Sequence, residues 1–114
     1  MRPPTATVTR REVALVLLLG AVLAAYFTWP MAPKLGSIGR LELGDGQFSV
    51  WNVAWVAHAI VTPGVVMFDA NIFHPHHGTL AYSEPNLGAG LIAVPAYLLS
   101  GRNPYAAHNS VVLV

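Results

Sequence analysis

The side chains best suited to chemistry lie in the segment GDGQFSVWNVAWVAH, which runs from Gly44 to His58. Glycines flank Asp45 on both sides, so the backbone can turn tightly there, and the acid stands where a helix N-cap is expected. A helix that follows advances about 100° per residue, which places Trp51, Trp55 and His58 on one side of it. The carboxylate of Asp45 could then act as a general base beside an aromatic surface, or it could simply cap the helix.

A second polar segment, residues 69–85, holds three closely spaced histidines, which are His74, His76 and His77. Three imidazoles together with Asp69 or Glu84 would supply enough ligands for a metal ion. However, a proline fixes the backbone between the first two histidines, and adjacent residues of an extended chain point to opposite sides. No HExxH motif or Cys/His framework supports a site. We therefore predict no metal site and interpret the histidines as hydrogen-bonding residues of a loop.

The composition indicates a membrane protein. Charged residues make up 10% of the 114-residue chain and apolar residues 54%, whereas a soluble domain carries about 25% charged residues. So short a chain cannot bury this much apolar surface in one core, and lipid is therefore the expected environment. A net charge of +1 without a basic stripe argues against nucleic-acid binding, and the absence of cysteine excludes disulfides and cysteine-ligated zinc.

Hydropathy divides the chain into polar and apolar segments, and the fold class predicted is an all-α integral membrane protein. The predicted order is a transmembrane helix, a long external loop with an interfacial amphipathic helix, and further transmembrane helices. By residue number, we predict a cytoplasmic lead over 1–12, a first transmembrane helix over 13–30, an external loop over 31–85 with the amphipathic helix at about 47–61, a second transmembrane helix over 86–100, and the start of a third over 104–114. Since this last segment has no closing loop, we interpret the chain as a fragment of a larger polytopic protein.

The orientation follows from the positive-inside rule, because Arg2, Arg10 and Arg11 precede the first apolar run. We therefore expect the N-terminus in the cytoplasm and the long loop outside, with Arg102 again on the cytoplasmic side. A cleavable signal peptide is the alternative, but the apolar run is long for one and ends without a small-x-small cleavage site.

These features together resemble a known family. The Gly44–Asp45 pair, the WNVAW motif and the segment MFDANIFHPHHGTLAYSE, from Met67 to Glu84, are similar to the N-terminal part of bacterial polytopic glycosyltransferases of the GT-C fold, among them YfhO-like and mannosyltransferase-like proteins. The resemblance covers about Leu17–Asn109. It implies transfer of a sugar from a polyprenyl-phosphate donor to an acceptor at the external face of the bacterial inner membrane, by a longer protein of which this fragment alone is not expected to be active.

The resemblance also assigns roles to residues. Asp45 matches the catalytic acid of the first external loop, and Glu42 is the candidate for a second acid, since many members carry paired acids where this chain has glycines. For substrate binding we predict four residues, which are Asn52, Trp51, Arg40 and Glu84. Of these, Arg40 would face the donor phosphate, and Glu84 could equally be a helix-start acid. The resemblance allows a divalent cation as a cofactor and leaves metal dependence open. The predicted partners are membrane lipid and a polyprenyl-phosphate sugar, not nucleic acid, and the oligomeric state is left open.

The alternative is a protein of another class, a non-enzymatic polytopic membrane protein such as a transporter or assembly subunit, whose loop is structural. Transporters carry polar or broken positions within their spans, and the first apolar run has none beyond Gly20 and Thr28. The glycosyltransferase is therefore the preferred prediction.

Overall fold

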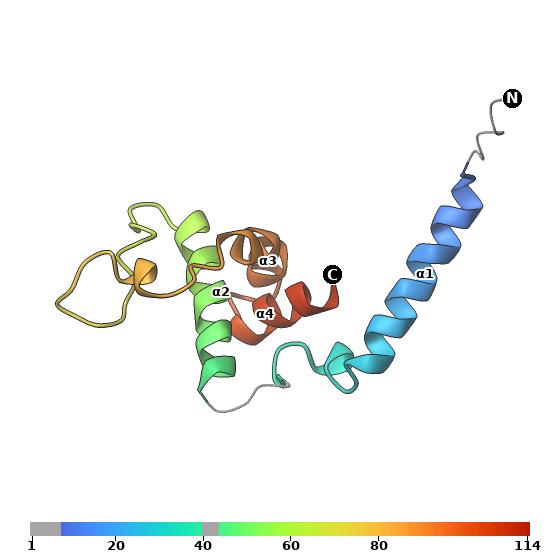
Figure 1. Ribbon diagram of the computed structural model, residues 1–114, viewed down its shortest axis with the longest axis horizontal. Coiled ribbons are helices and arrows are strands. Elements are labelled where there is room, and N and C mark those ends of the chain that lie inside the picture. Colours follow the sequence, from blue (N-terminus) through green and yellow to red (C-terminus); the bar gives the residue numbers. More distant parts are fainter. Residues whose placement is uncertain (1–7, 40–43) are drawn as a thin grey trace, which may run out of the picture.

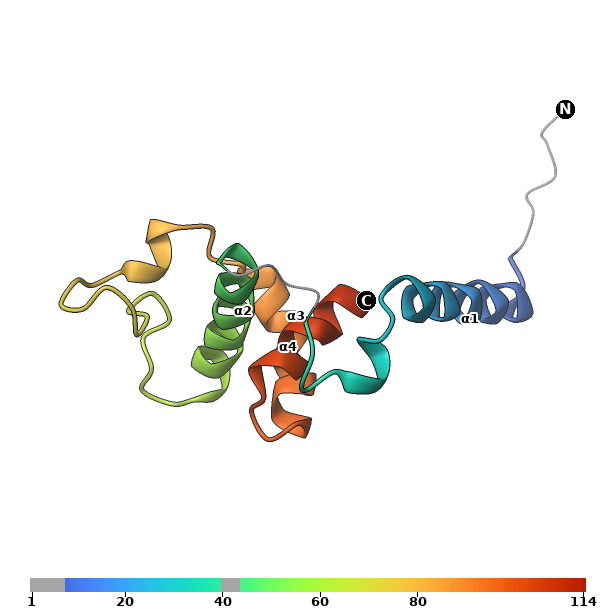
Figure 2. The same cartoon turned by 90° about the horizontal axis from the view of Figure 1, so that it is seen from below.

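Four α-helices and two short 3-10 helices make up the regular structure of residues 8–39 and 44–114, the part of the chain that the computed structural model describes (Figure 1). The helices are α1 (Arg10–Phe27), η1 (Ala32–Lys34), α2 (Asp45–Val61), η2 (Thr79–Tyr82), α3 (Leu87–Leu99) and α4 (Pro104–Leu113). Helices α2, α3 and α4 pack against one another, and Figure 2 shows α1 projecting away from them. The described part of the chain is therefore all-helical.

Helix α1 begins at Arg10 because Thr9 and Glu12 form a capping box. The Thr9 hydroxyl oxygen accepts from the Glu12 N–H at 3.3 Å, and the Glu12 carboxylate accepts from the Thr9 N–H at 2.7 Å. The hydrogen bond from the Thr9 N–H, followed by that from its hydroxyl, holds the pKa of Glu12 below its usual value. The first turn of α1 therefore carries two arginines and a glutamate, at positions where the sequence predicts a polar lead.

The predicted membrane-spanning architecture is contradicted by the helix lengths. No helix within residues 8–39 and 44–114 is both long and apolar enough to cross a bilayer. In α1 the charged first turn leaves about 15 residues, roughly 22 Å at 1.5 Å per residue, against a hydrocarbon core of about 30 Å. Helices α3 and α4 are shorter still, with 13 and 10 residues. The predicted fold class of an integral membrane protein, the multi-pass inner-membrane location and the orientation derived from it are therefore wrong.

Helix α2 is the central helix of the packed part. Seven of its residues are buried, which are Val50, Asn52, Val53, Ala54, Val56, Ala57 and Ala59. Its small residues Ala54 and Ala57 lie in one core cluster with Ala93 of α3 and Ala107 of α4. The prediction of an amphipathic helix lying on a membrane surface is wrong, because α2 packs against α3 and α4 of the same chain and seven of its residues are buried.

A buried amide fastens the segment after α1 to α4. Asn109 has no exposed surface, and its Nδ2 donates to the carbonyl oxygens of Leu35, at 2.8 Å, and Ile38, at 2.5 Å. Asn103, at the start of α4, donates from its own Nδ2 to the Gly36 carbonyl oxygen at 3.0 Å. These bonds satisfy carbonyl groups of a segment that lies outside the helices and has no regular hydrogen-bond partner for them. The segment is thereby held against α4.

The long segment between α2 and α3 folds back onto α2. Trp55 Nε1 donates to the Met67 carbonyl oxygen at 2.8 Å, and Asn52 Nδ2 donates to the Glu84 carbonyl oxygen at 2.8 Å. The bond to Met67 lies near the beginning of the segment and the bond to Glu84 near its end. Both ends of the segment are therefore fixed to α2.

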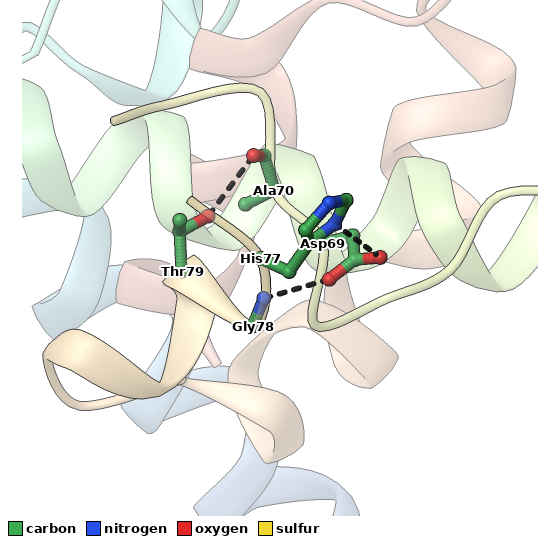
Figure 3. A network of polar contacts seen from close by, with 5 residues as sticks. All are labelled: Asp69, Ala70, His77, Gly78 and Thr79. Carbon is green, nitrogen blue, oxygen red and sulfur yellow. Dashed lines mark hydrogen bonds and ion pairs between the residues drawn. The ribbon is translucent and has the colours of Figure 1, made fainter. Parts of the chain in front are cut away.

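Within this segment a carboxylate holds the turn that precedes η2 (Figure 3). Asp69 Oδ1 accepts from the Gly78 N–H at 2.7 Å, and Asp69 Oδ2 lies 3.4 Å from His77 Nδ1. The Thr79 hydroxyl donates to the Ala70 carbonyl oxygen at 3.0 Å. The backbone hydrogen bond from Gly78 is the main reason that the pKa of Asp69 lies below its usual value, and the proximity of His77 adds to it.

Candidate ligand-binding groove

An open groove of about 420 Å³ lies between α2 and the turn that joins α3 to α4. Its lining residues are Gln47, Val50, Trp51, Ala54, Trp55, His58, Asn71, Tyr97, Arg102, Pro104 and Tyr105. The six from α2 recur three or four positions apart, so one side of that helix forms a continuous wall. The volume falls within the range of small-molecule sites.

Trp51 and Trp55 supply the largest aromatic surface of the groove. Their ring centroids are 6.4 Å apart and their planes are nearly parallel, at 16°. Both indole N–H groups are already used, since Trp51 Nε1 donates to Asn71 Oδ1 at 3.1 Å and Trp55 Nε1 donates to the Met67 carbonyl oxygen at 2.8 Å. Because these bonds fix the ring positions, the tryptophans offer a ligand apolar ring surface rather than hydrogen bonds.

His58 places a polar group beside the tryptophans. Its Nδ1 lies 3.3 Å from the Thr62 hydroxyl oxygen and 3.3 Å from the Tyr97 hydroxyl oxygen, and its ring centroid lies 5.7 Å from that of Trp55. Each hydroxyl can donate to or accept from an imidazole nitrogen, according to the tautomer. The contact with Tyr97 joins α2 to α3 and holds the imidazole at the wall of the groove.

Arg102 brings a permanent positive charge to the groove, and no carboxylate is present among the described lining residues. It follows Gly101 in the turn after α3, where both residues have positive φ, 70° for the glycine and 68° for the arginine. The Arg102 N–H donates to the Tyr97 carbonyl oxygen at 2.7 Å, which closes the end of α3. Its guanidinium has no ion-pair partner in the part of the chain that the structure describes.

The first turn of α4 adds further positive potential next to Arg102. Asn103 caps this helix by accepting from the Ala106 N–H at 3.1 Å, and Pro104 and Tyr105 line the groove. The Tyr105 N–H belongs to the first turn, where no carbonyl group four residues earlier lies within the helix. Helix N-termini attract anions for this reason.

Of the predicted site residues that the structure describes, only Trp51 lines this groove. Asp45 is the first residue of α2 and Gly44 is its N-cap, so the cap lies one residue earlier than predicted. The Asp45 side chain lines a separate cleft. Arg40 and Glu42 lie outside the described residues.

Asn52 and Glu84 are brought together, but away from the groove. Asn52 is fully buried, and its Nδ2 donates to the backbone carbonyl oxygen of Glu84, while its Oδ1 has no partner among the described residues. Helix α3 begins at Leu87 with Asn86 as its N-cap, so Glu84 precedes the helix. Substrate binding by Asn52 and Glu84 stays a prediction that no contact with the groove supports.

Two of the three neighbouring histidines, His76 and His77, have different surroundings. His77 lies against Asp69, and the ring of His76 lies 6.4 Å from that of Tyr82. Within residues 8–39 and 44–114, no group of three histidine, aspartate or glutamate side chains is arranged to hold a metal ion.

Among the groove residues that sequence reasoning missed are Tyr97, Arg102 and Tyr105. The sequence pattern places Tyr97 in a predicted membrane helix and makes Arg102 a signal of orientation. The groove exists because the turn between α3 and α4 folds against α2, and contacts so distant in sequence leave no local pattern. The available signal was the turn itself, Gly101 to Pro104, which places a cation between two helices.

No family model, curated protein or solved structure matches this chain. The assignment to membrane glycosyltransferases of the GT-C fold therefore has no support from relatives, and its membrane-spanning part is contradicted by the helices. What is shown is an all-helical fold.

Proposed function

We propose that this chain binds a sugar phosphate in the groove between α2 and the α3–α4 turn. The observation that carries the proposal is that one groove combines an aromatic surface, formed by Trp51 and Trp55, with the cation of Arg102. Aromatic surface favours the sugar, and the cation favours the phosphate.

The sugar half of the ligand is favoured by the mixed lining. One face of a pyranose ring carries mainly C–H groups and packs on an aromatic ring, while its hydroxyls require hydrogen-bond partners around the edge. Trp51 and Trp55 supply such a surface in fixed positions. Gln47 and His58, which line the same groove, supply polar groups that can donate to or accept from hydroxyls.

The phosphate half is favoured by the electrostatics around Arg102. The guanidinium of Arg102 can form paired hydrogen bonds with phosphate oxygens. The Tyr105 N–H and the dipole of α4 add to the attraction for an anion. No described lining residue is acidic, so no carboxylate among them repels a bound phosphate.

The proposal is limited to binding. Since Asp45 lines a different cleft, His58 is the one side chain among the described lining residues that could serve as a general base. Transfer of the sugar from a polyprenyl-phosphate donor, with Asp45 as base, stays a prediction from the resemblance. A binding protein without transfer activity is closer to the non-enzymatic alternative.

A titration of the full chain with glucose 1-phosphate, followed by calorimetry or NMR, tests the proposal. Replacing Arg102 with Gln should weaken binding about tenfold or more, the scale of a lost hydrogen bond to a charged group. The matched control is Lys34→Gln, which removes a cation from η1, outside the groove, and should leave the affinity unchanged. Equal affinities of the two variants, or equal binding of glucose 1-phosphate and free glucose, would refute the phosphate site.

A further inference from the structure

A second cleft of about 300 Å³ lies on the other side of Trp51. Its lining residues are Asp45, Phe48, Trp51, Ile72, Phe73, Thr79, Leu80, Tyr82 and Ser83. Trp51 is the one residue that lines both this cleft and the groove described above. The second cleft therefore has its own set of side chains, drawn from the first two turns of α2 and from the segment around η2.

Four of these side chains are aromatic and form two pairs on opposite elements. On α2, the ring centroids of Phe48 and Trp51 are 5.3 Å apart. On the segment around η2, the rings of Phe73 and Tyr82 are stacked at 5.9 Å, with 25° between their planes. Aromatic ring faces carry a negative electrostatic potential, so several of them around one space attract an organic cation.

Asp45 gives the second cleft a negative charge. It is the one ionisable acid among the described lining residues, and its carboxylate has no ion-pair partner in the described part of the chain. The N-terminus of α2 opposes it with a partial positive charge of about half an elementary unit, which is smaller than the full charge of the carboxylate. The net field at the cleft therefore favours a cation.

The walls of the cleft are held in place before any ligand binds. On the α2 side, Trp51 Nε1 donates to Asn71 Oδ1 at 3.1 Å. On the η2 side, the Leu80 N–H donates to the Phe68 carbonyl oxygen at 3.1 Å, and the bonds of Asp69 and Thr79 drawn in Figure 3 fix the turn before η2. A rigid cleft loses less conformational entropy on binding than a mobile one.

We propose that this second cleft is an aromatic cage for a quaternary ammonium group of choline type. A primary ammonium has three N–H donors and needs three acceptors, whereas six of the nine described lining residues are aromatic or aliphatic and Asp45 is the one charged residue among them. A trimethylammonium group has no N–H donor, so ring faces and one nearby carboxylate satisfy it completely.

Titration of the full chain with choline, observed by NMR at about pH 8, above the ordinary pKa of histidine, tests the cage. Choline should shift the resonances of Phe48, Phe73 and Tyr82, while 3,3-dimethylbutanol, its neutral isostere, should bind at least fivefold more weakly. Asp45→Asn preserves the shape of the acid and should weaken choline binding about fivefold. Tyr82→Leu should weaken it about threefold, and Tyr82→Phe, which keeps the ring, should not.

The same titration separates this proposal from the sugar-phosphate groove. Arg102→Gln should leave choline affinity unchanged, and Asp45→Asn should leave glucose 1-phosphate affinity unchanged, because each residue lines only one of the two sites. A second titration uses monomeric short-chain phosphatidylcholine. If it binds more tightly than choline, the cation is carried by a lipid headgroup, and if choline binds more tightly, the cation is free; either result supports the cage. The proposal is overturned if choline and its neutral isostere bind equally, if Asp45→Asn binds choline like the unaltered chain, or if about 50 mM choline causes no shift.

Discussion

At the scale of single residues, polar side chains of this protein act mainly by fixing backbone that has no regular structure. Asp69 accepts the Gly78 N–H, Asn109 donates to two carbonyl oxygens, and Trp55 donates to a third. Each bond satisfies a backbone group that no helix could satisfy. From the sequence alone, charged and amide residues can be interpreted as catalytic or ligand-binding. Several of them instead form hydrogen bonds that hold the backbone in place.

Asp69 makes a pH-dependent contribution to stability. Its pKa is lowered in the folded chain, so it stabilises the fold above its ordinary pKa of about 3.8, and this stabilisation is lost as the pH falls through the lower, folded value. The unaltered chain should therefore have a higher denaturation midpoint than Asp69→Ala at about pH 7, and the difference should shrink below about pH 4. Urea unfolding at several pH values measures it, and a difference that stays constant down to about pH 2 would contradict the assignment.

At the scale of helices, periodicity and capping signals predict that helices occur near the observed positions, but they do not predict what each helix contacts. From composition alone, the apolar runs are expected to face lipid. In the structure, Ala57, Ala93 and Ala107 are small enough for α2, α3 and α4 to approach closely and cover one another. Likewise, Trp51, Trp55 and His58 share a side of α2 as their spacing predicts, but the partners that complete the groove come from residues 97–105, which spacing within α2 could not identify.

The close approach of α3 to α2 depends on Gly90. A Cβ atom added at this glycine would lie 2.3 Å from Val56 Cγ1, far inside van der Waals contact, and Val56 is fully buried. Gly90→Ala should therefore destabilise the fold by about 1–3 kcal/mol, the usual range for overpacking a core. Gly88→Ala is the matched control, because the added Cβ meets nothing within 4 Å and alanine favours the helix.

Denaturant unfolding of the two glycine variants gives the comparison. The control should be as stable as the unaltered chain or slightly more so. If Gly90→Ala is as stable as Gly88→Ala, the two helices are not in close contact at this position.

At the scale of the whole molecule, the chain consists of a packed three-helix part and a projecting α1. The overall dimensions of 66 × 37 × 24 Å reflect this division, and α1 buries none of its residues. Large apolar side chains of α1, among them Leu15, Leu17 and Leu19, are more than half exposed. The stability of the packed part should therefore come from α2, α3, α4 and the segments bonded to them, and hardly at all from α1.

Two N-terminal truncations test this division. The first removes the chain up to the segment that Asn109 binds, and the second removes that segment as well. Removing residues 1–28 takes away α1 but keeps the carbonyl groups of Leu35 and Ile38, so the free energy of unfolding should change by less than about 0.5 kcal/mol. Removing residues 1–39 also takes away those carbonyl groups and leaves the buried Asn109 amide without acceptors. Since an unsatisfied buried polar group costs about 1–3 kcal/mol, this second truncation should lower the stability by at least that amount.

Circular dichroism during urea unfolding reports both values. Equal stability of the two truncated chains would show that the Asn109 bonds do not hold the molecule together, and a large loss in the shorter truncation would show that α1 is part of the folded unit.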